Sequence, residues 1–240
     1  MDDSKIYRWA GICSLAAQAL FFIEFPFYVV RTGFHGVADA AGLVAYTTTY
    51  GTNIMTCVFL DFIILTLFMI FLAGFRHLIR QADAQQEWLG TLVFGVGLVW
   101  VALTLVADLL QAATVVDART LPGDGIVIRA MLESTYLMYG SGALFLIAVF
   151  IAAGGYAGVA SRAFPGWSGW VAYSCALVCL AFVPSMFVGS PDFMRFYNAI
   201  GWGAIIAECL PLTVWMIVVG ILMIRKGRQV RSATIAPQRS

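Results

Sequence analysis

Six long apolar stretches alternate with short polar segments along the chain, over residues 9–30, 53–75, 89–116, 126–153, 168–188 and 199–224. Each is close to or above the roughly 20 residues that a helix needs to cross the hydrocarbon core of a bilayer. The short-period alternation of a membrane barrel is absent. The pattern predicts an all-α, polytopic integral membrane protein: a six-transmembrane-helix bundle in one domain, residues 1–226. We expect the basic tail, residues 227–240, to be disordered.

The composition agrees with this class of protein. Hydrophobic residues make up 61% of the 240 residues and charged residues 11%, against roughly 25% charged in soluble domains. The formal net charge of +1 does not indicate a nucleic-acid partner, and membrane lipids are the expected surroundings. All five cysteines fall in apolar stretches, which predicts buried, inert thiols and no disulfide framework.

Basic residues predict the orientation in the membrane. An even number of spans puts both termini on one side. Ten Lys and Arg residues then lie on that side and four on the other, and basic residues are retained on the cytoplasmic side. We expect a bacterial inner-membrane protein with both termini in the cytoplasm. The longest outer connection, residues 31–52, is expected to be a structured loop, with a short surface helix as the alternative.

One acidic residue lies inside each of five spans. At about 1.5 Å of rise per residue, all five fall in one layer about 10–14 Å below the outer surface. We find no Lys, Arg or His at that depth, so several carboxyls should carry a proton unless water or a cation fills a shared cavity. These candidate catalytic residues are Glu24, Asp61, Asp108, Glu133 and Glu208.

Aromatic and polar residues flank the acids at helical spacing. Three prolines, Pro26, Pro184 and Pro211, lie within spans, and each frees a carbonyl one turn earlier that needs a partner. The candidate substrate-binding residues are Tyr28, Phe68, Trp100, Thr104, Gln111, Tyr136 and Trp215.

Two functions fit this cavity. The first is the binding, and transport, of a cation, a proton or a cationic amphiphile, with acids as the charge complement and aromatic rings as cation–π surfaces. The second is an intramembrane enzyme that uses carboxyl acid–base chemistry on an apolar lipid or isoprenoid, as a cyclase or isomerase. A structural role, with the acids bonded to neighbouring helices, is the third. We expect no cofactor and no metal, because His35 and His77 are the only histidines and fall at opposite faces of the membrane. The oligomeric state is left open.

Five short motifs resemble an uncharacterised bacterial family of six-span membrane proteins, a domain of unknown function, over about residues 6–226. The resemblance implies a bacterial inner-membrane protein in which the acids are family positions, and it implies no reaction. The motifs are Arg8-x-Ala10-Gly11, Phe22-Ile23-Glu24, Leu60-Asp61, Ala107-Asp108-Leu109 and Phe164-Pro165-Gly166.

Overall fold

The computed structural model describes residues 2–31, 40–120, 125–188, 194–199 and 201–235, which are almost entirely helical. Two short 3-10 turns, Ala84–Gln86 and Val183–Phe187, and one π-helical turn, Met138–Gly142, interrupt the α-helices. The helices are α1 (Asp3–Arg31), α2 (Ala40–Ala82), α3 (Glu87–Thr120), α4 (Gly125–Leu137), α5 (Ala143–Ala160), α6 (Gly166–Phe182) and α7 (Trp202–Ile235).

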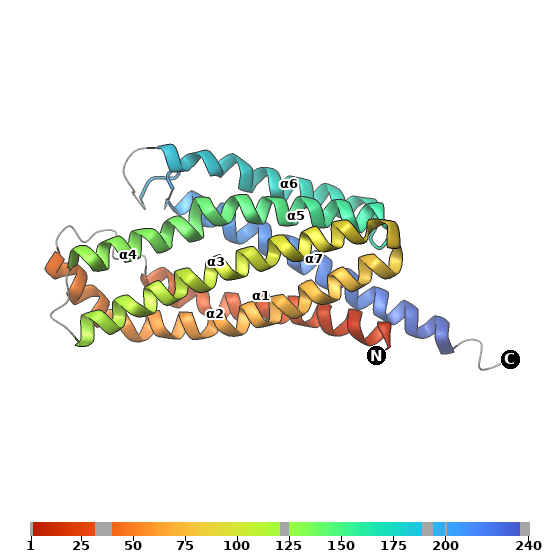
Figure 1. The fold of residues 1–240 in the computed structure, drawn as a ribbon, viewed down its shortest axis with the longest axis horizontal. Helices are drawn as coiled ribbons and strands as arrows, with labels where there is room; N and C mark the ends of the chain where they lie inside the picture. Colours follow the sequence, from red (N-terminus) through yellow and green to blue (C-terminus); the bar gives the residue numbers. More distant parts are fainter. Residues whose placement is uncertain (1, 32–39, 121–124, 189–193, 200, 236–240) are drawn as a thin grey trace.

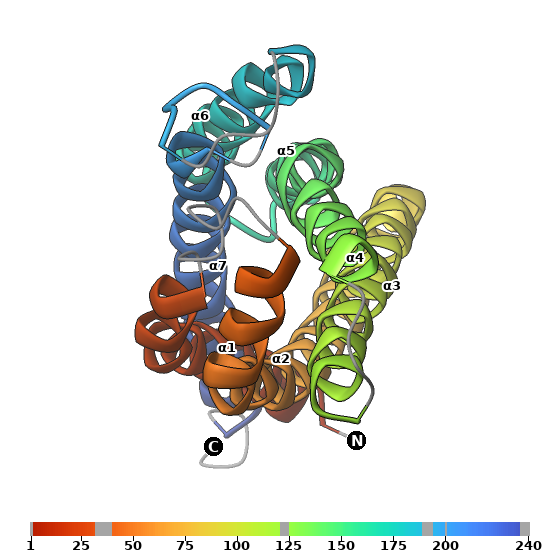
Figure 2. The same ribbon diagram turned by 90° about the vertical axis from the view of Figure 1, so that its left-hand side faces the viewer.

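Six segments in the described part of the chain are long and apolar enough to cross a membrane, because α4, the π turn and α5 form one of them. This confirms the predicted all-α bundle and makes the chain a multi-pass membrane protein. The start of α1 and the end of α7 lie at the same end of the elongated bundle (Figure 1). In the end view, α6 lies at the edge of the bundle, where it packs on α5 and α7 (Figure 2).

Two helices are longer than their apolar stretches predict. Helix α2 begins at Ala40, so residues 40–52, expected to be a loop, form the first turns of a 43-residue helix. Thr48 and Thr49 donate their hydroxyls to the carbonyls one turn earlier, both at 2.8 Å, which satisfies these polar groups without ending the helix. Helix α7 likewise continues to Ile235, through residues expected to be disordered. His35 and most of the predicted turn at 121–125 lie outside the described residues.

Small residues let neighbouring helices approach closely. A Cβ atom on Gly11 of α1 would lie 2.5 Å from the Gly220 carbonyl oxygen of α7. Nearby, the Ser14 hydroxyl donates to the Met216 carbonyl at 2.7 Å. Spans associate in lipid through such close packing and hydrogen bonds. The contact fixes α1 against α7, and both helices carry acids that line the pocket described below.

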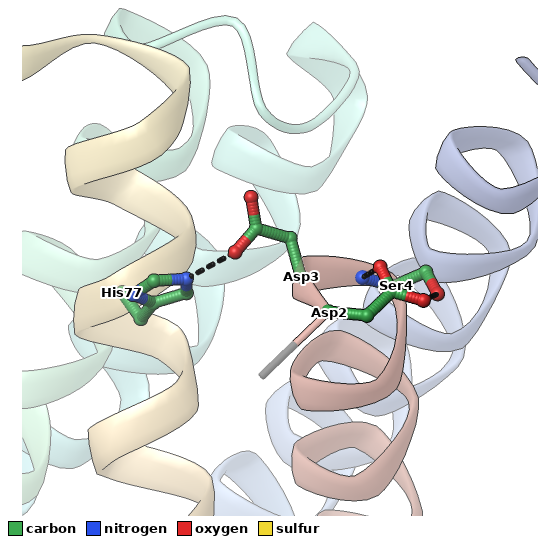
Figure 3. Close-up of polar contacts among 4 residues, drawn as sticks. All are labelled: Asp2, Asp3, Ser4 and His77. Carbon is green, nitrogen blue, oxygen red and sulfur yellow. Dashed lines mark hydrogen bonds and ion pairs between the residues drawn. The ribbon is translucent and has the colours of Figure 1, made fainter. Parts of the chain in front are cut away.

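Polar contacts join α1 to α2 at the end of the bundle that holds the termini (Figure 3). The Asp3 carboxylate lies 2.9 Å from Nε2 of His77. Beside it, Ser4 donates its hydroxyl and its backbone N–H to Asp2, at 2.7 and 3.1 Å, and these bonds lower the pKa of Asp2. His77 lies on the last turns of α2, which extends beyond the predicted span 53–75 to Ala82.

Candidate functional site

An acidic pocket lies where α1, α2, α3, α7 and the π turn meet, with a cavity of about 100 Å³. That volume has room for several water molecules. Three of the five predicted acids, Glu24, Asp61 and Glu208, line it. Its remaining walls are apolar or uncharged: Ala17, Gln18, Phe21, Phe25, Ile64, Leu65, Phe68, Trp100, Thr104, Tyr139, Cys209, Leu212 and Thr213.

The three acids share one electrostatic environment. The Cys209 thiol interacts electrostatically with the carboxyls of Glu24, Asp61 and Glu208, and Asp61 interacts in the same way with Glu208. Glu24 is almost completely buried, and the other two acids are partly buried. Among the residues that the structure describes, no Lys, Arg or His lines the pocket. The pocket therefore gathers negative charge, or carboxyl protons, in apolar surroundings.

Asp108 is linked to this pocket through one hydrogen bond. Its carboxyl is fully buried on α3 and accepts a hydrogen bond from the hydroxyl of Tyr139. Tyr139 itself lines the pocket. The fourth predicted acid is therefore one side chain away from the cavity.

The π turn explains why Tyr139 was missed at the sequence level. In a regular α-helix, the face of Glu133 continues through Tyr136 to Gly140. The π turn Met138–Gly142 breaks that register, and Gly140 has non-helical backbone angles, φ −76° and ψ −108°. A Cβ atom on Gly140 would lie 2.4 Å from the Ala199 carbonyl oxygen. Tyr139 therefore takes the place on the pocket side that the sequence assigned to Tyr136.

Glu133 does not belong to the pocket, which corrects the expectation that all five acids share one cavity. Its carboxylate lies 3.8 Å from Nη1 of Arg129, one turn earlier on α4, and its side chain is 39% exposed. Six residues, about 9 Å of helix, separate it from Tyr139. The expectation that no basic residue reaches the acids is therefore wrong at Glu133.

The candidate binding residues divide into two groups. Phe68, Trp100 and Thr104 line the pocket as predicted. The buried indole N–H of Trp100 has no hydrogen-bond partner within the described part of the chain, and such a donor is normally satisfied by water. Gln111 is buried but does not line the pocket. The side chain of Tyr28 lies outside the described residues.

Two aromatic candidates belong to the packed core instead of the pocket. Trp215 is 1% exposed, and its ring centroid lies 5.0 Å from that of Phe150. A Cβ atom on Gly154 would lie 2.6 Å from the same indole, so the glycine makes room for it. Tyr136 packs with Leu43 and other residues in a smaller apolar cluster. The sequence placed each of these rings on the same helix face as an acid, but neither ring lies in the acidic pocket.

Two prolines act as the sequence predicts, in different ways. Pro211 lies inside α7, and the carbonyl that it frees, on Ala207, accepts a hydrogen bond from the Cys179 thiol at 3.2 Å. Pro184 lies in the 3-10 turn that follows the end of α6. There the Leu180 carbonyl accepts from the Val183 N–H.

Sequence reasoning also missed Gln18, Cys209 and Thr213 as pocket residues. Gln18 lies six residues before Glu24 with Phe21 between them, a spacing that a search for polar residues near the acids could have found. Within the described ranges, no three His, Cys, Asp or Glu side chains are placed to hold a metal ion.

Comparison of the chain with protein-family models, with curated proteins and with solved structures gave no match. The resemblance to a bacterial six-span family stays a prediction.

Proposed function

We propose that this membrane protein binds a proton or a small cation in the acidic pocket and moves it across the membrane. One observation carries the proposal: Glu24, Asp61 and Glu208 line a single cavity, and none of the described residues in its wall is basic. Burying an ionised carboxylate costs several kcal/mol. Protons or a bound cation would offset that cost, and water inside the cavity would reduce it.

The size of the cavity favours a small ion over the larger ligands. Pockets for drug-sized molecules are about 300–1,000 Å³, whereas this cavity is about 100 Å³. A proton carried by water, or a monovalent cation, fits that space. An isoprenoid or a cationic amphiphile would need the pocket to widen, which is the main argument against the intramembrane cyclase or isomerase.

Hydrogen bonding suggests how the ion would leave the pocket. Tyr139 lines the cavity and donates a hydrogen bond to Asp108. A proton could therefore pass from the pocket acids through the Tyr139 hydroxyl to the fully buried carboxyl of Asp108. Pro26 and Pro211 interrupt the hydrogen-bond ladders of α1 and α7 beside the pocket. Broken ladders in transporter helices are where conformational change and ion binding concentrate.

We also propose that the protein lies in the bacterial inner membrane with both termini in the cytoplasm. The charge bias of ten basic residues against four supports this orientation, because basic residues are retained in the cytoplasm. In that orientation, the ion would pass through the pocket between the cytoplasm and the outer side of the membrane.

Reconstitution in liposomes tests the proposal. The purified protein is placed in vesicles that contain a pH-sensitive dye, and an inward proton gradient is imposed. The lumen should then become acidic, either with protons alone or only when Na⁺ or K⁺ moves across the membrane in exchange. Either pattern supports an ion-conducting pocket. Vesicles that behave like protein-free vesicles with protons, Na⁺, K⁺ and methylammonium would contradict it.

A further inference from the structure

A second cavity, separate from the acidic pocket, lies between the α5–α6 turn and α7. Its volume is about 250 Å³, and its walls include Phe164, Pro165, Leu222, Arg225, Lys226 and Gln229. The turn lies at the end of the bundle that holds both termini (Figure 1). The cavity is therefore far along α7 from the acids near the start of that helix.

Positive charge dominates this second cavity. Arg225 and Lys226 line it, and none of the described residues in its wall is acidic. Neither cation forms an ion pair with any residue that the structure describes. Pro165, also in the wall, immediately precedes the 17-residue helix α6, whose first turn has no side-chain cap. The unpaired N–H groups and the dipole at such a helix start favour a negative charge.

The α5–α6 turn, which forms one wall of the cavity, is closed by its own backbone. Arg162 has φ 57° and is the one described non-glycine residue with a positive φ. It follows the end of α5 at the position where a glycine usually stands, and the Phe164 N–H closes the turn on the Gly158 carbonyl at 3.0 Å. The Arg162 side chain is exposed and does not line the cavity, so the turn contributes Ala163, Phe164 and Pro165 to the wall.

Two tryptophans place the cavity at the level of the lipid headgroups. Trp167 and Trp170, on the first turns of α6, are 52% and 76% exposed, and exposed tryptophans at span ends lie at the membrane–water interface. Phe164 and Leu222 give the cavity an apolar wall beside its cations. That combination suits a phosphate group attached to acyl chains better than a free phosphate ion.

We propose that this cavity binds the phosphate-bearing headgroup of an anionic phospholipid. Basic pockets between membrane helices bind such headgroups through charge and hydrogen bonds. Arg225 and Lys226 contact the phosphate, Gln229 offers an amide, and the start of α6 adds backbone donors. The bound lipid then holds the α5–α6 turn against α7.

Native mass spectrometry of the detergent-solubilised protein tests this site. After incubation with equal amounts of phosphatidylglycerol and phosphatidylcholine, the wild type should retain phosphatidylglycerol in preference. The double variant Arg225→Gln/Lys226→Gln should need about tenfold more phosphatidylglycerol for the same occupancy, the change that about 1.4 kcal/mol of lost binding produces. Arg228→Gln/Arg231→Gln is the matched control, because it removes equal charge from α7 at positions outside the cavity.

The remaining outcomes also decide the question. Lys226→Gln, which removes one of the two cavity cations, should also retain less phosphatidylglycerol than the wild type; it tests the site even if the double variant does not fold. Equal losses in the double variant and its control would show non-specific charge attraction and overturn the proposal. Equal retention of phosphatidylcholine, or complete displacement of the lipid by millimolar inorganic phosphate at constant ionic strength, would also overturn it.

Discussion

Glu208→Gln is expected to reduce ion movement into proteoliposomes at least about tenfold, without loss of the folded protein. Glu208 lines the acidic pocket, interacts electrostatically with Asp61 and lies beside Cys209. The amide keeps the shape of the side chain but can neither release a proton nor neutralise a cation. A loss of about 1.4 kcal/mol of interaction with the ion is enough for a tenfold effect. The rate of lumen acidification, normalised to reconstituted protein, measures it.

Glu133→Gln is the matched control for this prediction. It makes the same chemical change in another acid of a membrane span, but Glu133 pairs with Arg129 outside the pocket. Exposed pairs of this kind contribute only about 0–1 kcal/mol, so the variant should move ions at close to the wild-type rate. If both variants lost activity equally, the acidic pocket would not be the site of ion movement.

Trp215→Ala is expected to lower the free energy of unfolding by about 3–5 kcal/mol, the usual cost of truncating a large buried aromatic side chain. Trp215 packs against Phe71, Phe75 and Phe150, and its removal leaves a cavity that Gly154 cannot fill. Unfolding of the detergent-solubilised protein by a denaturing detergent, followed by circular dichroism, measures the change. Any effect on ion movement should be no larger than the loss of folded protein explains.

Trp88→Ala provides the comparison for that prediction, because the indole of Trp88 is 61% exposed at the start of α3. Its replacement should change stability by well under 1 kcal/mol, as surface substitutions usually do. If the Trp215→Ala variant were as stable as the wild type but bound the ion more weakly, Trp215 would be a pocket residue, which would contradict its position in the packed core.

Counting residues from the ends of the spans brought Glu24, Asp61 and Glu208 to one place. This succeeds because helical rise is constant, so position along a span determines depth. The same counting could not show which way each face turns. Glu133 and Trp215 lie on faces directed elsewhere, and those directions depend on the packing of neighbouring helices.

Local irregularities account for most of the other differences. The π turn at Met138–Gly142 brings Tyr139 into the pocket, and hydrophobic periodicity carries no signal for such a turn. The polar start of α2 looked like a loop because Thr48 and Thr49 are not apolar, although each bonds to its own helix. The pair of Arg129 and Glu133 was readable from its spacing of four residues.

A double-mutant cycle on Glu208 and Asp61 tests the central claim, that these acids act together on one ion in one pocket. The affinity for the transported ion would be measured for the wild type, Glu208→Gln, Asp61→Asn and the double variant in the same liposomes. Because residues that share one partner are not additive, we predict that the double variant is scarcely weaker than the worse single variant. Independent, additive losses in the double variant would contradict a shared ion site.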